Sequence, residues 1–424
     1  QYYDRITEMD ARAGAALSEI EQAGLTDNTI VFFYGDHGSG MPRNKRYVYD
    51  SGLHVGLIVY IPEKYQHLAP PDYKPGGVSE RLISFVDLAP TVLSIAGIKP
   101  PDWIEGKAFM GKFIQPSPKY LFGLRGRMDE RCDLSRSVRN QRYVYIRNYM
   151  PFLICGQHVS YMFETPTTRI WKKLYDEGKL KPPKTYFWEP KPPEELYDLE
   201  NDRDEVNNLA NSPVHKEILS ELRSALNTHI LSTRDTGFLP EADMHTRAQG
   251  TTIYEMAHSK DKYPLEKILD VADKASNLRM EETNFLIKSL DDNDPAVRYW
   301  AALGLLMRKE NGVVQGEQKL VKLLDDKSPT VRIASAYCLA QYGQDSNYAK
   351  ALNTLKELSD PSKNGFFVSI LALNVIDNLG NKANELKEYL KTIPVEDKFA
   401  PQRLKSNIPK LLSHLLNTNI ATQE

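Results

Sequence analysis

The sequence predicts an α/β domain with a partial parallel sheet, then a smaller antiparallel subdomain, then an all-α repeat domain. Three observations support this order. Helical and continuous apolar segments alternate over residues 1–118, short strand-like segments follow over 119–250, and a helical pattern repeats over 251–424. At 424 residues, the chain is long enough for two or three domains.

The first predicted domain begins with an amphipathic helix. Apolar residues recur at helical spacing over residues 3–20, and Gly24 follows as a stop signal. Residues 28–34 and 55–61 are apolar runs of the kind found in buried parallel strands, and 84–96 predict a further helix. Open α/β sheets of this kind place their chemistry at the carboxyl ends of the strands.

A smaller sheet is predicted next. Residues 120–123, 135–139, 143–147 and 194–199 have the short strand patterns that are typical of antiparallel sheets. A helix over 214–231 is expected to end this subdomain.

An internal repeat defines the last domain. The sequence IKSLDDNDPAVRYWAAL recurs as VKLLDDKSPTVRIASAY, so Arg298 and Arg332 lie 34 residues apart, and a weaker copy covers 358–379. A helix, a turn with proline and a second helix rich in Ala and Leu resemble HEAT-like repeats, in which each helix pair buries its apolar face against a neighbour. We therefore expect Val297 and Val331 to be buried. An unrelated helical bundle is the alternative.

Composition limits the classes of function. The chain has 54 basic and 56 acidic residues, a balance that argues against general nucleic-acid binding. It has no apolar run of 18 residues, so we expect no membrane span. The three cysteines, Cys132, Cys155 and Cys338, have no metal-type spacing; the first two can pair, although nothing in the sequence requires it.

Polar residues follow the first apolar strand directly. Asp36 and His37 lie at its carboxyl end, where a carboxylate and an imidazole suit metal ligation, although an aspartate there can also simply form a turn. Lys45 lies between Arg43 and Arg46, either as an anion contact or as a solvated loop lysine. Arg125, Arg127 and Asp129 can wall a pocket, but we expect them to be solvated at the surface.

Four phrases point to a family. They are YYDRITEMD (2–10), LTDNTIVFFYGDHG (25–38), KRYVYDSG (45–52) and VDLAPTVL (86–93). In this order they resemble the C-terminal half of the sulfatase catalytic domain, in the alkaline-phosphatase superfamily. ELYDLEND (195–202) and NLA (208–210) resemble the family's closing strand and turn, which extends the resemblance over residues 1–245. The resemblance implies a partial alkaline-phosphatase-like parallel sheet and hydrolysis of sulfuric esters.

The resemblance also implies roles for residues. Asp36 and His37 are implied metal ligands, and Ca²⁺ is the implied ion; because many members have Asn in place of His37, Mg²⁺, Mn²⁺ or Zn²⁺ are alternatives. Lys45 is the implied catalytic contact to the sulfate. Arg43, His54 and Arg127 are weaker candidates for substrate binding.

One element of the family is absent. The nucleophile is a formylglycine made from a Cys/Ser-x-Pro-x-Arg motif, which this sequence lacks; the segment from Cys132 to Arg136 has no proline. We therefore expect the formylglycine and the other metal ligands in a missing N-terminal part, and residues 1–424 alone to be inactive. A periplasmic or extracellular location is expected, with its signal in that part.

The partner implied by the resemblance is a sulfated glycan or another sulfate ester, and the Tyr- and Trp-rich stretch 143–190 suits stacking on sugars. The HEAT-like repeats can bind protein or pack on the catalytic domain. Two alternatives remain: a phosphonate or phosphate diester hydrolase of the same superfamily, and a non-catalytic repeat scaffold.

Overall fold

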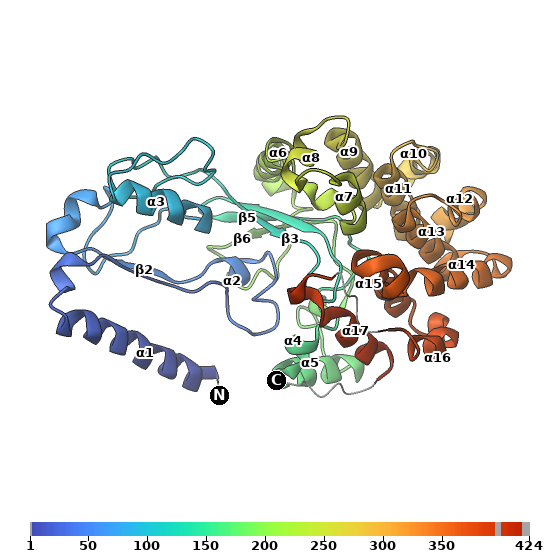
Figure 1. Ribbon diagram of the computed structural model, residues 1–424, viewed down its shortest axis with the longest axis horizontal. Coiled ribbons are helices and arrows are strands. Elements are labelled where there is room, and N and C mark those ends of the chain that lie inside the picture. Colours follow the sequence, from blue (N-terminus) through green and yellow to red (C-terminus); the bar gives the residue numbers. More distant parts are fainter. Residues whose placement is uncertain (1, 395–399, 418–424) are drawn as a thin grey trace. The chain divides into compact units, whose positions relative to one another are not determined.

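The computed structural model describes residues 2–394 and 400–417, and the chain divides into two compact units (Figure 1). The first unit comprises Gln1–Gly38, Ser51–Leu121 and Arg139–Tyr143; the second comprises Ser39–Asp50, Phe122–Val138 and Val144–Glu424. The predicted boundary at 118 lies close to the end of the long segment of the first unit. The predicted boundary at 250 falls inside the second unit.

The first unit contains the helices and strands that its apolar patterns predict. They are α1 (Tyr2–Gln22), β1 (Val31–Tyr34), α2 (Asp50–Leu53), β2 (Leu57–Tyr60) and α3 (Leu88–Ile95). The first residue of α2, Asp50, is the last residue of a segment of the second unit. A small core joins β1, β2 and α3, and in it Ile61, Phe109 and Met110 are buried against Phe32 and Val59.

The pairing of the two strands differs from the prediction. β1 and β2 are antiparallel, with Val31 opposite Tyr60 and Tyr34 opposite Leu57, whereas a parallel sheet was expected. A parallel pair needs a crossover connection, usually a long helix. The connection, residues 35–56, is described throughout and contains only the four-residue helix α2, so the chain returns beside β1 in the opposite direction.

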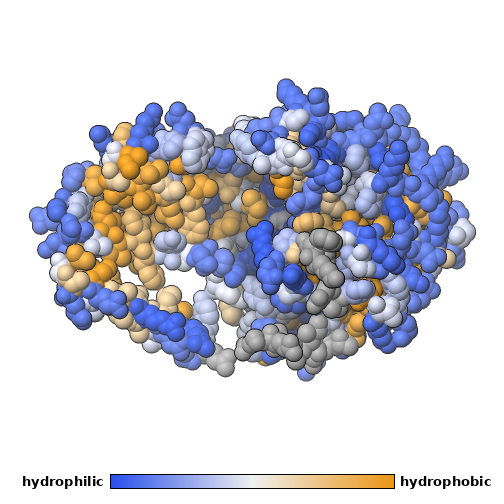
Figure 2. Space-filling model, in the orientation of Figure 1, coloured by the Kyte–Doolittle hydropathy of each residue, from blue (hydrophilic) through white to orange (hydrophobic). Residues whose placement is uncertain are grey.

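Much of the apolar surface of the first unit is exposed. None of the residues of α1 is buried, and β1 is not the buried strand predicted, because Phe33 and Tyr34 are 38% and 46% exposed. On β2, Ile58 is 64% exposed. Figure 2 shows apolar side chains gathered over the region of β2 and α3. Apolar side chains of both strands are therefore exposed to solvent.

The second unit is built around a four-stranded sheet in the consecutive order β3-β4-β5-β6. A tight turn from Asn140 to Tyr143 joins β4 to β5, as in an antiparallel hairpin. The strands match the predicted ones to within two residues and are β3 (Leu121–Arg125), β4 (Ser135–Arg139), β5 (Tyr143–Asn148) and β6 (Glu194–Asp198).

Helices make up most of the rest of the second unit. Two lie between β5 and β6, namely α4 (Ser160–Glu164) and α5 (Pro166–Asp176). Those after the sheet are α6 (Lys216–Ser232), α7 (Glu241–Arg247), α8 (Ile253–His258), α9 (Leu265–Ser276), α10 (Thr283–Ser289), α11 (Pro295–Met307), α12 (Lys309–Leu323), α13 (Pro329–Tyr342), α14 (Asp345–Leu358), α15 (Pro361–Leu379), α16 (Lys387–Leu390) and α17 (Asn407–Leu415). None of the described helices is both long and apolar enough to cross a bilayer.

The repeat pattern becomes a stack of helices, α9 to α15 (Figure 1). Val297 in α11 and Val331 in α13 are 1% and 0% exposed, so the predicted burial is confirmed. The turns follow the sequence as well: Asp294 caps α11 by accepting the amide of Ala296, and a proline opens the helix at the next position. A proline also opens α13 and α15, and Asp360 caps α15 in the same way, whereas Ser328 before α13 makes no side-chain cap.

Candidate functional site

Asp36 and His37 follow β1 at a tight turn. Gly38 closes this turn, because a Cβ there would lie 2.2 Å from the carbonyl oxygen of Ser51, which only glycine can accommodate. The turn brings the two side chains together: His37 Nε2 lies 3.1 Å from Asp36 Oδ2. Both are accessible, with 83% of the Asp36 side chain and 42% of the His37 side chain exposed.

This pair can supply two ligands to a metal ion. Within residues 2–394 and 400–417, no group of three or more His, Cys, Asp or Glu side chains assembles that could hold one. A Ca²⁺ ion takes 6 to 8 oxygen ligands, and only Asp36 of this pair offers oxygen, so the donors present fit a small part of such a ligand set, whereas the imidazole of His37 suits a transition metal such as Zn²⁺.

Lys45 lies in the loop 39–50, which belongs to the second unit. Its amide donates to Ser39 O at 3.1 Å, and its ammonium lies 5.6 Å from the centre of the Tyr161 ring. The side chain is half-buried, and no carboxylate of the described residues pairs with it. An ammonium group held in this position can bind an anionic group of a ligand.

Two arginines hold the loop on either side of Lys45. Arg43 and Arg46 have φ values of 68° and 83°, which non-glycine residues rarely adopt. The Arg43 guanidinium donates to the carbonyls of Asp204 and Glu205, the latter at 2.6 Å. Arg46 pairs with Asp129 at 2.8 Å, and its guanidinium lies 3.4 Å from the centre of the Tyr161 ring.

The loop is anchored a third time at its end. Glu205 is 1% exposed and accepts the amide of Asp50 through Oε2 at 2.9 Å. Burial raises the pKa of Glu205 to about 8, although the Asp50 amide and the nearby Arg43 oppose the shift. The sequence gives no sign of this anchor, because Glu205 lies 155 residues from Asp50 along the chain.

The other candidate residues are dispersed. Arg127 pairs with Glu241 at 2.5 Å and donates to Asp129 O, and Arg43 is engaged by carbonyls, so both guanidiniums already have structural partners. His54 lies exposed just after α2, in the first unit. These partners give no support to the predicted substrate contacts of Arg43 and Arg127.

The expected solvation of Arg125 and Arg127 is wrong. Only 3% of the Arg125 side chain and 11% of the Arg127 side chain are exposed. Arg125 ends β3 and enters a buried ion network instead, because Asp133 lies 3.0 Å from its Nε. The sequence shows these residues as a polar loop and gives no indication of the partners that bury them.

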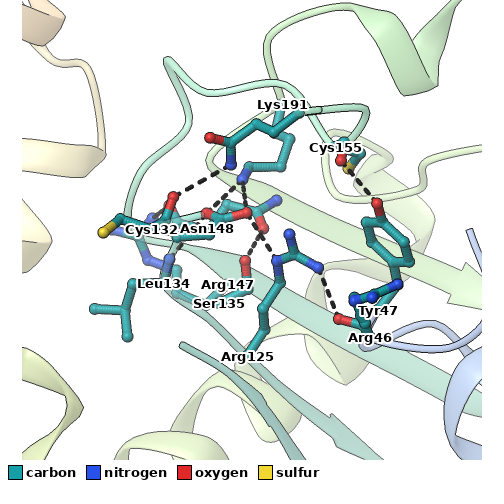
Figure 3. A network of polar contacts seen from close by, with 12 residues as sticks. Arg46, Tyr47, Arg125, Cys132, Leu134, Ser135, Arg147, Asn148, Cys155 and Lys191 are labelled. Carbon is teal, nitrogen blue, oxygen red and sulfur yellow. Dashed lines mark hydrogen bonds and ion pairs between the residues drawn. The ribbon is translucent and has the colours of Figure 1, made fainter. Parts of the chain in front are cut away.

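Figure 3 shows this network around the start of β4. Lys191 Nζ lies 2.6 and 2.7 Å from the two carboxylate oxygens of Asp133, and Arg125 also donates to Arg46 O at 2.8 Å. Burial alone would raise the pKa of Asp133, but Lys191 and Arg125 hold it below its usual value. Through Arg125, the network contacts the loop that carries Lys45. Cys132, Cys155 and Cys338 are all free thiols.

Comparison with known proteins separates two regions. Residues 1–98 match the sulfatase family, and residues 283–373 match HEAT repeats. The chain is 40% identical over 243 residues to an ulvan-active sulfatase of Formosa agariphila, with 57% of this chain and 39% of that protein covered. It is 27% identical over 239 residues to human N-sulphoglucosamine sulphohydrolase, covering 53% of this chain and 46% of that protein.

A solved structure in complex with its substrate, D-glucosamine-2-N,6-O-disulfate, is 20% identical with a TM-score of 0.38 and covers 55% of this chain and 40% of that chain. The chain thus spans less than half the length of each of these proteins. The predicted resemblances are confirmed in both regions: residues 1–98 are sulfatase-family sequence, and residues 283–373 are HEAT repeats.

Proposed function

We propose that the chain is part of a sulfuric ester hydrolase that acts on a sulfated carbohydrate. The observation that carries the proposal is the match of residues 1–98 to the sulfatase family, a segment that includes Asp36, His37 and Lys45. The names of two relatives support the substrate class, since one is an ulvan-active sulfatase and the other a hydrolase of N-sulphoglucosamine.

In this function Lys45 contacts the sulfate group. Cleavage of a sulfate ester places negative charge on the non-bridging oxygens and on the leaving oxygen, and a fixed cation stabilises that charge. Lys45 meets the requirement, because its ammonium has no carboxylate partner among the described side chains and its loop is held by Arg43, Arg46 and Glu205. A preorganised cation needs little rearrangement when the charge develops.

Asp36 and His37 supply two ligands of a divalent metal ion, for which Ca²⁺ is the proposed identity. When bound, such an ion acts as a Lewis acid toward the sulfate oxygens. The described residues do not complete its ligand set, and the sequence contains no formylglycine motif. The function therefore requires a nucleophile and further ligands that are not provided by residues 1–424.

The test compares residues 1–424 with the full reading frame that encodes them, on an aryl sulfate, on sulfated oligosaccharides and on a phosphate diester. We expect hydrolysis of sulfate esters by the full frame and none by residues 1–424 alone. In the full frame, Lys45→Ala should lower kcat by about 100-fold or more, as expected for loss of a group that stabilises developing charge.

Lys74→Ala, at an exposed lysine of the same family segment, is the matched control and should retain activity. Full activity of the Lys45 variant would refute the role of this residue. Turnover by residues 1–424 alone, or a full frame that cleaves only the phosphate diester, would refute the proposed function.

A further inference from the structure

The second unit contains an open pocket of about 630 Å³ that the proposed chemistry does not use. The segment that follows β5 and the helices α13, α15 and α17 line it. A volume of this size falls within the usual range for sites that bind small molecules. It also suits one or two sugar rings.

Aromatic side chains from separate segments form part of the wall. Phe152 meets Tyr337 edge to face, with ring centres 6.1 Å apart. His158 stacks between Phe163 and His414, at 4.3 and 3.9 Å. Burial lowers the pKa of His158 to about 3, so its ring is neutral at ordinary pH, but both of its faces are covered by this stacking. The rings of Phe152 and Tyr337 are the ones that suit the apolar face of a sugar.

Buried polar atoms in the same wall have no partner. Gln157 is 7% exposed; its amide nitrogen donates to Cys132 O at 3.2 Å, but its Oε1 has no partner, and neither does His158 Nδ1. Both atoms are fully buried, so they make the wall more polar but offer no direct hydrogen bond to a ligand in the pocket. Asp377 adds a fixed acceptor, because Arg131 holds it at 2.6 Å.

A weakly paired cation is part of the lining. Lys172 lines the pocket and pairs at 2.5 Å with Asp176, whose side chain is 54% exposed. A solvent-exposed pair of this kind contributes little, so Lys172 can turn to an anionic group of a ligand at small cost. Because Asp377 is paired with Arg131, Lys172 is the charged side chain of the lining that can turn to an anion.

We propose that this pocket binds a sugar unit with an anionic substituent, as a second glycan subsite of the enzyme. The short helix α4 connects it to the loop of Lys45: Tyr161 contacts Lys45 and Arg46, whereas Phe163, two residues further, lines the pocket. Residues two apart point to opposite sides of a helix. The identity of the ligand as part of the substrate rests on the proposed function.

The test measures binding of three tetrasaccharides to residues 1–424 by calorimetry and saturation-transfer NMR: a sulfated glycosaminoglycan, the same compound after desulfation, which keeps its carboxylates, and neutral maltotetraose. We expect saturable binding of the sulfated compound and at least tenfold weaker binding of maltotetraose. Binding of the desulfated compound would show that a carboxylate suffices as the anion.

Variants of the lining test whether the sulfated compound binds in this pocket. Lys172→Gln should weaken binding of the sulfated compound by about tenfold, and Asn378→Ala, at an exposed residue of the lining, by a few-fold. Lys173→Gln, at the neighbouring exposed lysine that is not part of the lining, should change it less than twofold.

Equal binding of maltotetraose or an unchanged Lys172 variant would overturn the proposal. In the full reading frame, Lys172→Gln should raise KM for the oligosaccharide and leave the turnover of an aryl sulfate unchanged. If the protein made from the full reading frame binds the sulfated tetrasaccharide in this pocket but has no sulfatase activity, only the proposed function is refuted. If it has sulfatase activity but does not bind the tetrasaccharide in this pocket, only the second subsite is refuted.

Discussion

The buried carboxylate of Asp133 offers a direct test of what holds the second unit together. It is 5% exposed and lies between Arg125 and Lys191, whose side chains are only 3% and 4% exposed. In the variant Asp133→Asn, both cations stay buried without a counter-charge. Loss of one partner of a buried ion pair typically costs about 3–5 kcal/mol, so we expect a loss of that size.

Hydrogen exchange measured on peptides of residues 132–148 and 191–198 is a suitable assay, because the two units need not unfold together. A loss of about 3–5 kcal/mol corresponds to exchange that is faster by about two to four orders of magnitude. Acid should have the same effect in the wild-type chain. The pKa of Asp133 is lowered in the folded state, so its stabilisation is present above the unfolded value near 3.8 and is lost as the pH falls below it.

Lys191→Met is the control, since it removes one cation but keeps Asp133 paired with Arg125 at 3.0 Å. It should cost less than Asp133→Asn. The double variant should cost less than the sum of the two single variants, because only Arg125 is then left without its carboxylate. Exchange in Asp133→Asn within threefold of the wild type, or strict additivity in the double variant, would refute the reasoning.

Two further predictions concern the stability of the same unit. The contribution of His158 to stability should fall as the pH drops from 6.5 to about 3, because folded His158 resists protonation. The contribution of Glu205 should fall as the pH rises from 4.5 to about 8, because folded Glu205 keeps its proton, and the two contributions oppose each other between pH 4.5 and 6.5. In denaturation midpoints measured against pH, His158→Gln should flatten the acid limb and Glu205→Gln the alkaline limb, and unchanged limbs would contradict the assignment. Val331 is 0% exposed, so Val331→Ala should lower the free energy of unfolding of the helical repeats in urea by about 2 kcal/mol. Val314 is 48% exposed, so Val314→Ala should change it by no more than about 0.5 kcal/mol. Equal effects of the two variants would argue against a tightly packed stack.

Local patterns explain which parts of the fold the sequence predicts. Burial of Val297 and Val331 follows from a repeat whose helices pack on their neighbours along the chain, so nearby residues contain the information. The pairing of β1 with β2 does not follow, because an apolar run looks the same in a parallel and in an antiparallel sheet. The direction depends on how residues 35–56 return the chain, which periodicity does not encode.

The candidate site also has one part that the sequence predicts and another that it does not. Asp36 and His37 are adjacent in sequence, and their proximity in space follows from the turn at Gly38. The partners of Arg43 and Arg127 lie more than 100 residues away, in Asp204, Glu205 and Glu241, so no local pattern distinguishes an arginine that is free to bind an anion from one that is already engaged.

These long-range contacts determine how Lys45 is presented. Arg43 and Arg46 adopt left-handed backbone conformations on either side of it, and each such residue costs about 1–3 kcal/mol unless the surroundings stabilise it. The surroundings here are Glu205, which accepts the Asp50 amide, together with the carbonyls and the carboxylate bound by the two arginines. All of these partners lie in the second unit, beyond residues 1–98. The conformation that offers the Lys45 ammonium to an anion therefore depends on residues that do not themselves contact it.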